Sequence, residues 1–274
     1  MFTSSSGSGD AGDLTINTQE LFVRDGADIN AGTLGGGNGG NLNVTASETI
    51  EVIGETANGE VGSSLLAGNE IGSTGDGGDL TINTARLVVR DGALVDASTF
   101  GQGKSGNLNV TASEKIEVIG KSADGIFLSG LFAGAGRGST GNAGDLNINT
   151  NILQINQGSV SVESRGTGNG GNLNINVNSL GLDNNGSIGA TTRSVNKDPN
   201  NPQANININS RDLILRNGSK IRANAQGQDV IGGNINIDTG VLAGFENSNI
   251  TDNSQDFRGG NVRIGTQGIF GMQF

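Results

Sequence analysis

Short segments of strictly alternating apolar and polar residues return along the whole chain. Residues 14–17 read Leu-Thr-Ile-Asn, and each such segment follows a small residue, mostly Gly, and then an Asp or Asn. This order is typical of a turn followed by a half-buried strand. The segments begin at nine positions, which are Gly12, Gly40, Gly78, Gly106, Gly144, Gly171, Ala204, Gly233 and Gly260.

The segments are also copies of one another. Residues 12–18 return as residues 78–84 and, nearly unchanged, as residues 144–150, at two equal intervals. Residues 40–48 return as residues 106–114 at the same interval. Self-similarity at a fixed period indicates a repeat architecture, in which each repeat packs on its neighbours.

Two further short apolar runs follow in most units, for example residues 21–23 and 27–29. The order is strand, turn, strand, turn, strand and loop, without helical periodicity. We therefore expect an all-β fold, a right-handed parallel β-helix of about nine coils, each of 26–38 residues with three short strands. An antiparallel sandwich also has short strands at regular spacing, but it would not return the same strand sequence once per unit.

Residues 1–274 are expected to form a single domain. The 66-residue double coil covers about residues 12–177, and residues 178–274 form more divergent coils. Pro199 and Pro202 mark a loop in the divergent part, because proline cannot donate a hydrogen bond to a ladder.

Coils of two lengths alternate, and the extra length falls in residues 54–75 and 120–141. Glycines at the turns between strands are expected to supply an open backbone conformation. These corner glycines are Gly26, Gly92, Gly158, Gly186 and Gly218.

The alternation predicts which side chains stack inside the coils. One buried row is Leu14, Leu42, Leu80, Leu108, Leu146, Leu173, Ile206, Ile235 and Val262. The next is Ile16, Val44, Ile82, Val110, Ile148, Ile175, Ile208, Ile237 and Ile264. An outward row of Thr and Asn is expected to hydrogen-bond between coils, as such ladders do in stacked strands.

Composition narrows the chemistry. The chain lacks Cys, which excludes disulfides and thiolate metal sites, and it lacks His, the commonest general base. A formal charge of −11 argues against nucleic acid and anionic membranes as partners. No apolar run approaches the roughly 20 residues of a membrane-spanning helix, and residues 1–5 show no signal-peptide pattern.

The repeated GDLTINT and GNLNVTA strands and the Arg-Asp-Gly corners at 24–26 and 90–92 resemble the repeat region of filamentous-haemagglutinin-like exoproteins, particularly the large cyanobacterial ones. Residues 232–251 and 267–274 fit the same resemblance, which covers nearly the whole chain. It implies an adhesive rod on the surface of a Gram-negative bacterium, outside the outer membrane. It also implies two-partner secretion, in which a dedicated outer-membrane pore exports the full-length protein.

The family's signal peptide and amino-terminal secretion domain have no match here, and residues 198–202 echo its Asn-Pro motif only superficially. We therefore expect the chain to be a fragment of a longer protein.

Four kinds of site compete with purely structural roles. Asp76 and Asp79 in a Gly-rich turn resemble calcium-binding rolls, but such turns come once per coil and most carry Asn, so a tight turn is the simpler interpretation. A carboxylate pair could cleave polysaccharides. In the first outward row, however, charged and neutral residues alternate, which leaves neighbouring carboxylates roughly 9.6 Å apart and limits their repulsion. That row is Asp13, Asn41, Asp79, Asn107, Asp145 and Asn172.

Sugar binding usually needs an aromatic platform, and without Trp or Tyr only Phe can supply one. The candidates are Phe100, Phe127 and Phe132, either core-facing or part of an exposed contact loop. Ice binding favours flat Thr arrays, whereas the outward row here mixes Thr and Asn.

We predict a non-catalytic structural and adhesive rod segment, with a carbohydrate-active β-helix enzyme as the alternative. No catalytic, cofactor or metal residues are assigned. The expected partners are a surface receptor or glycan and the secretion pore, but not nucleic acid. Residues 1–11 are too small and polar to cover the first coil, and residues 271–274 end without a cap, so weak end-to-end association is also expected.

Overall fold

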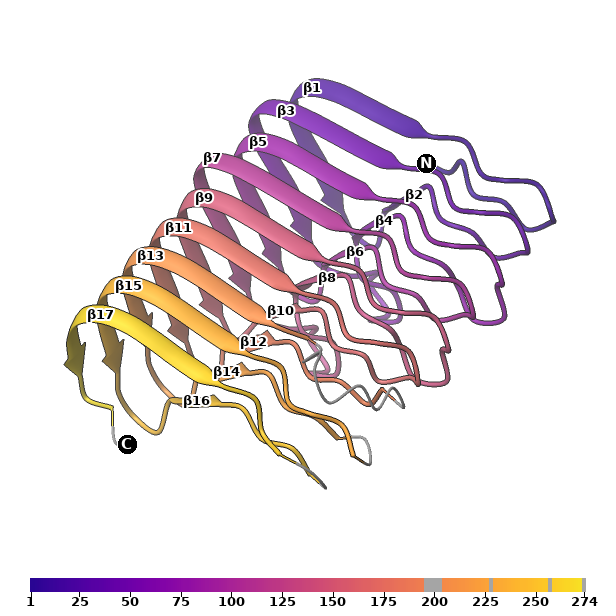
Figure 1. Cartoon of the computed structure of the whole chain (residues 1–274). Coiled ribbons are helices and arrows are strands. Elements are labelled where there is room, and N and C mark those ends of the chain that lie inside the picture. The colour runs from indigo at the N-terminus through magenta and orange to yellow at the C-terminus, as the bar shows by residue number, and fades with distance from the viewer. Residues whose placement is uncertain (195–203, 227–228, 256–257, 273–274) are drawn as a thin grey trace.

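The computed structural model describes residues 1–194, 204–226, 229–255 and 258–272. These residues contain two parallel sheets, one of nine strands and one of eight, and no helix. The strands of each sheet follow one another in chain order, so the chain winds as a stack of coils (Figure 1). The fold is a parallel β-helix, as predicted. In the described residues nothing helical is long and apolar enough to cross a membrane.

Each coil contributes one long strand to the nine-stranded sheet and, in all but the last coil, one three-residue strand to the other sheet. The long strands are β1 (Leu14–Arg24), β3 (Leu42–Ile53), β5 (Leu80–Arg90), β7 (Leu108–Ile119), β9 (Leu146–Asn156), β11 (Leu173–Asp183), β13 (Ile206–Leu215), β15 (Ile235–Gly244) and β17 (Val262–Phe270). The short strands are β2 (Asp28–Asn30), β4 (Ser64–Leu66), β6 (Leu94–Asp96), β8 (Gly130–Phe132), β10 (Ser159–Ser161), β12 (Ser187–Gly189), β14 (Lys220–Arg222) and β16 (Asn249–Thr251).

The strand register places like residue on like. Leu42 pairs with Leu14 on one side and Leu80 on the other, and the same alignment continues to Ile235 and Val262. The step along the chain from one partner to the next is longest from Leu42 to Leu80 and from Leu108 to Leu146, and shortest where β9 pairs with β11 and β15 with β17, within the predicted range of coil lengths. The stacking of both rows read from the sequence is therefore confirmed, and their members are buried except at the two ends, where Leu14, Ile16 and Ile264 are partly buried and Val262 is exposed.

The number of strands per coil differs from the prediction. Residues 14–18 and 21–23 were expected as two strands, but β1 runs through both, and only residues 28–30 form a second strand. A third line of pairing exists only as single bridges, such as Ser5 to Thr33 and Thr33 to Asn69. Backbone hydrogen bonding continues around the bend of the long strand. The two apolar runs therefore belong to two segments of one bent strand and not to two separate strands.

A bulge accommodates this bend in the amino-terminal coils. The register between β1 and β3 shifts between Thr18 and Glu20, because β3 has one residue more than β1. The same shift recurs between β5 and β7, whereas β9 and β11 pair without one. An extra residue on one strand bends and twists it locally. The double-coil repeat of the sequence is thus also a repeat of strand length and of the position of the bulge.

The core is a narrow apolar column inside the coils. Leu108 is fully buried, with Leu80 and Leu146 directly beside it in the ladder. Short strands contribute a second wall through residues such as Leu65 and Val95. Each buried aliphatic side chain contributes about 1.5–3 kcal/mol, and the coils repeat that contribution along the rod.

The glycine before each long strand is required by the close approach of neighbouring coils. A Cβ on Gly106 would lie 1.8 Å from the carbonyl oxygen of Gly78, and one on Gly78 would lie 2.0 Å from that of Gly40. Neither glycine has a positive φ. At the position where the row has Ala204, the backbone takes a φ of 64° instead. Close packing of coils therefore explains the Gly of the signature.

The corner glycines only partly behave as predicted. Gly26, Gly92 and Gly218 have positive φ angles of 78°, 86° and 74°. Gly158 and Gly186 do not, because the left-handed residues in those coils precede them. Those residues are Gln157, Asn184 and Asn185.

The Asp or Asn after the glycine ties one coil to the next. The Asp13 Oδ1 atom accepts a 2.8 Å hydrogen bond from the backbone N–H of Asn41, and Asn41 Oδ1 accepts one from the N–H of Asp79. The pattern continues through Asp145 and Asn172 to Asn234 and Asn261. This hydrogen-bonding role gives the alternating Asp and Asn row a structural function.

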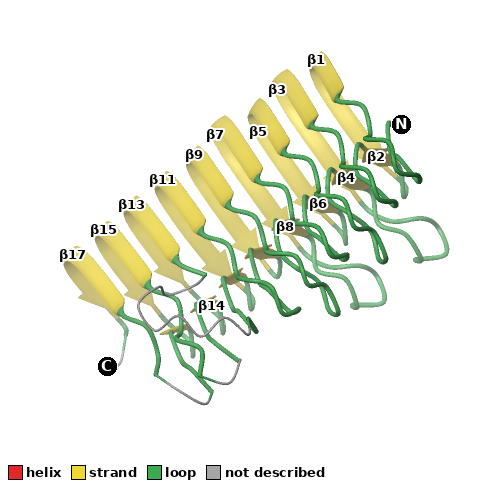
Figure 2. Cartoon of the chain, turned by 45° about the vertical axis from the view of Figure 1, so that its right-hand side comes forward, coloured by secondary structure: helices red, strands yellow, loops and turns green. Residues whose placement is uncertain are grey.

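The extra length of the long coils forms hairpins between a long and a short strand. Glu55 pairs antiparallel with Gly62 in the first, and Lys121 with Leu128 in the second. Loops gather along one side of the rod, as Figure 2 shows. The loop predicted at Pro199 and Pro202 lies outside the described residues.

Apolar side chains are less well covered at both ends of the chain than in the middle. Leu14 and Ile16 are only partly buried although residues 1–11 bridge to the first coil at Phe2 and Ser5. In the last coil, Val262 and Ile269 remain exposed.

Candidate binding cleft

The three candidate phenylalanines line one cleft on the short-strand face. It has a volume of about 420 Å³ and spans several coils, from Leu94 on β6 to Arg222 on β14. Phe100 and Phe127 are 39% and 48% exposed, and Phe132 is half-buried. The three side chains are therefore exposed or half-buried, so the core-facing interpretation is wrong for these residues, and their contact role stays a prediction. We call this site the aromatic cleft.

Two glycines leave the space that two of the phenylalanine rings occupy. A Cβ on Gly136 would lie 2.3 Å from Cδ1 of Phe100, so this ring lies against bare backbone of the next coil. A Cβ on Gly130 would lie 2.1 Å from Cζ of Phe132, so this ring folds back over its own strand. Both contacts need a residue without a side chain.

Phe127 reaches the cleft from the second hairpin, over residues 120–129. Ser122 holds the hairpin, since its N–H donates to the Phe127 carbonyl oxygen at 2.7 Å and its Oγ accepts from the Phe127 N–H at 2.9 Å. Ile126 and Leu128 flank Phe127, and both are exposed. The first hairpin carries Val61 at the matching position, so the aromatic cleft belongs to one coil pair only.

Asp96, at the end of β6, supplies a carboxylate to the cleft. Burial raises its pKa to about 6, despite hydrogen bonds from Ser98 that favour the charged form. The Ser98 N–H donates to Asp96 Oδ1 at 2.7 Å, and the nearby negative Glu70 raises the pKa further. Near neutral pH this carboxyl group therefore exchanges readily between its charged and protonated forms.

Glu163 brings a second carboxylate, held between two arginines. Its Oε2 atom lies 3.2 Å from Nη2 of Arg165, and its Oε1 atom lies 3.6 Å from Nη2 of Arg222. The carboxylate leans over Gly189 in the next coil, where a Cβ would lie 2.6 Å from Oε1. The Nε atom of Arg222 is buried without a hydrogen-bond partner in the described residues.

The aromatic cleft thus combines flat apolar rings with charged hydrogen-bonding groups. Such a combination suits a ligand with apolar faces and polar edges. Sequence reasoning found the phenylalanines but missed Asp96, Glu163 and Arg222. Their signal was faint, because Asp96 and Arg222 are single polar residues at the ends of short strands, Glu163 follows another short strand, and none has a copy one repeat earlier or later.

Asp76 and Asp79, the calcium candidates, have their own structural bonds. Asp76 Oδ1 accepts from the N–H of Lys104, and Asp79 Oδ1 from the N–H of Asn107, both at 2.8 Å. Within the described ranges, no three acidic side chains gather in a way that could hold a metal ion. Hydrogen bonds between coils therefore explain both aspartates, and no tight turn forms at residues 76–79.

A second hollow lies on the long-strand face. It is a groove of about 560 Å³ that runs over the outward residues of β7, β9, β11, β13, β15 and β17. We call it the asparagine groove, and its asparagines are Asn109, Asn147, Asn149, Asn174, Asn176, Asn207, Asn209 and Asn236.

Comparison with known proteins found no matching family model, no similar curated protein and no similar solved structure.

Proposed function

We propose that this chain is a non-catalytic structural and adhesive segment of a secreted bacterial surface protein of the filamentous-haemagglutinin-like kind. In this proposal the full-length protein leaves the cell through an outer-membrane pore and stands on the cell surface as a rod. The aromatic cleft is its contact site, and a surface glycan is the ligand.

The uniform build of the rod supports a structural role. The same buried rows and the same Asp/Asn ladder recur in coil after coil, so most of the chain is occupied in holding coils together. A solenoid of this kind extends by adding coils without changing its core. It suits a scaffold that displays contact sites at a distance.

The aromatic cleft is the observation that carries the adhesive part of the proposal. Phe100 and Phe132 lie against glycines, with their free ring faces available to a ligand. A sugar ring presents C–H groups on its faces and hydroxyls at its edge. The rings can pack on the former, while Glu163, Arg222 and the cleft serines bind the latter.

Binding of the 274-residue protein to a glycan array, followed by calorimetry with the best ligand, tests this proposal. Gly136→Ala should displace the Phe100 ring and weaken binding, because the new Cβ occupies the place of the ring. Phe100→Ala should weaken it similarly, and Phe22→Ala, an exposed phenylalanine on β1, is the control. Equal affinity of all four proteins would refute the cleft as the contact site.

A carbohydrate-active enzyme is the second candidate, and Asp96 favours it. A carboxyl group with a pKa of about 6 can hold a proton near neutral pH and act as a general acid. Glycoside hydrolysis also needs a second carboxylate, and Glu163 is the other carboxylate among the described residues that line the cleft. Release of reducing ends from polysaccharides, abolished by Asp96→Asn and by Glu163→Gln, would establish catalysis and refute the non-catalytic proposal.

A further inference from the structure

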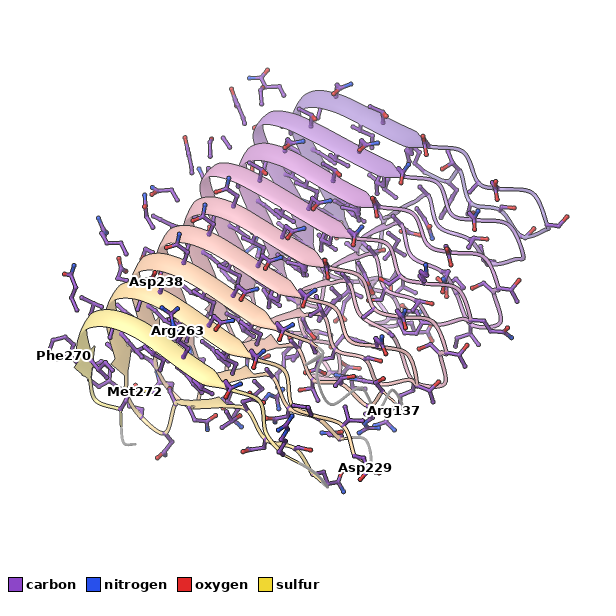
Figure 3. All side chains as sticks on the ribbon, in the orientation of Figure 1. Arg137, Asp229, Asp238, Arg263, Phe270 and Met272 are labelled. Atoms are coloured by element: carbon purple, nitrogen blue, oxygen red, sulfur yellow. The ribbon has the colours of Figure 1, made fainter. Side chains whose placement is uncertain are left out.

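The asparagine groove differs from the rest of the molecule in its charge. The chain carries a net charge of −11. The groove nevertheless follows two outward rows, the second and fourth residues of each long strand, and both rows are Thr or Asn from β1 to β13. Charges enter only in the last coils, with Asp238 on β15 and Arg263 on β17 (Figure 3). An uncharged strip of this length on an acidic protein suits an uncharged ligand.

One row of amides in the groove is held in place by its own hydrogen bonds. Asn147 Nδ2 donates to Asn109 Oδ1 at 2.9 Å, and Asn174 Nδ2 donates to Asn147 Oδ1 at 2.8 Å. The chain of bonds continues through Asn207 to Asn236. Each linked amide keeps a second N–H and a second lone pair, because an amide has two donors and two acceptor sites.

The second row, two residues further along each long strand, contains side-chain amides that make no hydrogen bonds within the described part of the fold. Asn149, Asn176 and Asn209 are exposed, and their side chains make no hydrogen bond within the described ranges. Both rows advance by one coil, about 4.8 Å, at each step. The groove therefore presents paired donors and acceptors at a constant spacing along the rod.

We propose that the asparagine groove binds an unbranched, uncharged polysaccharide laid parallel to the rod axis. An amide recognises a pair of hydroxyl groups by donating to one and accepting from the other. A sugar unit in an extended chain advances by a distance close to the spacing between coils, so several consecutive units can make the same contacts. This site lies on another sheet from the aromatic cleft and goes beyond the proposed function.

Other polymers fit the groove less well. An extended peptide needs a free sheet edge, but the backbone here is already paired on both sides within the nine-stranded sheet. Nucleic acid needs a surplus of positive charge, and the groove has only Arg263. Ice requires a flat surface, whereas this surface is hollowed and carries mostly Asn.

Binding of the 274-residue protein to a panel of neutral β- and α-linked glucan, xylan and mannan oligosaccharides tests the inference by calorimetry. Asn176→Ala combined with Asn209→Ala removes two amides that make no bonds in the fold. We expect the double variant to bind roughly tenfold more weakly or worse, because each lost hydrogen bond costs a few-fold in affinity. Asn83→Ala is the matched control, since Asn83 is exposed in the same row but outside the groove.

The outcomes are distinct from those for the aromatic cleft. Binding weakened by the double variant but unchanged by Phe100→Ala and Asn83→Ala would support the groove. Binding that Phe100→Ala abolishes while the double variant leaves it intact would assign the sugar to the cleft and overturn the inference. Failure of every neutral oligosaccharide to bind would overturn it as well, whatever the result of the cleft experiment.

Discussion

The two sheets of this solenoid differ in how they use repetition. On the long-strand face the outward positions in the first half of each strand carry Thr or Asn from β1 to β13, and amide side chains bond to their copies. On the short-strand face the position of Asp96 is Leu66 one coil earlier and Phe132 one coil later. Repetition gives a continuous strip with identical contacts, whereas variation gathers different groups into one cleft. The same backbone thus supports an extended site and a local one.

The sharpest test of the long-strand face compares its inner and outer rows. Leu108→Asp should destabilise the protein by several kcal/mol, because an unpaired carboxylate would replace a side chain enclosed by Leu80 and Leu146. Asn109→Asp should cost far less, since an aspartate oxygen can still accept the bond from Asn147. Thermal unfolding followed by circular dichroism measures both. Equal losses would mean that the strand register is wrong.

Glycines on the same face separate coil packing from backbone freedom. Gly106→Ala should cost about 1–3 kcal/mol, since its Cβ would meet the fixed carbonyl oxygen of Gly78. Gly181→Ala is the control, because its Cβ would have open space and its φ is not positive. We expect this control to be neutral or slightly stabilising. Denaturant titration should rank the two variants, and a harmless Gly106→Ala would contradict the proposed role of the glycine row.

The short-strand face should give the stability of the protein a pH dependence through Asp96. The pKa of Asp96 is about 6 in the folded protein, above the ordinary value of 3.8, so the folded state binds its proton more tightly than the unfolded state. The stability from this proton is fully present below about pH 4 and is lost as the pH rises through about 6.

Asp96→Asn removes this dependence. The variant should be more stable than the unmodified protein by on the order of 2 kcal/mol at pH 7.5, and the difference should vanish near pH 4. Unfolding curves at a series of pH values measure the difference between the two proteins. A difference that stays constant from pH 4 to pH 7.5 would show that Asp96 has an ordinary pKa.

The smallest expected effect concerns the two ends of the stack of coils. When the 274-residue chain is produced as it stands, Val262 and Ile269 at one end and Leu14 at the other are incompletely covered. We predict weak end-to-end association, opposed by the net charge of −11. Raising the salt from 0.1 M to 1 M shortens the Debye length from about 10 Å to 3 Å and should promote it. Sedimentation velocity measures this association, and monomers at both salt concentrations would refute the prediction.

Local pattern was enough to predict the buried rows of the solenoid. Alternation around Leu108 identified the inward side of a strand, and the fixed period of the repeat predicted which strands stack, because like sequences adopt like structures in register. The strand that begins at Leu108 could be assigned from the repeated signature without the structure, whereas the turn expected at Gly106 does not form. These properties depend on neighbours in the sequence or on exact copies of them.

The tertiary structure decided what no single repeat contains. It showed that the signature glycine serves close packing of coils, a distance between Gly106 and Gly78 that turn chemistry does not predict. It also brought Asp96, Phe127 and Glu163 together, although they come from three coils. Their meeting depends on the path of the hairpin and on the stacking order of short strands. The sequence determines the rod because its contacts repeat, and the fold alone determines the cleft because its contacts occur once.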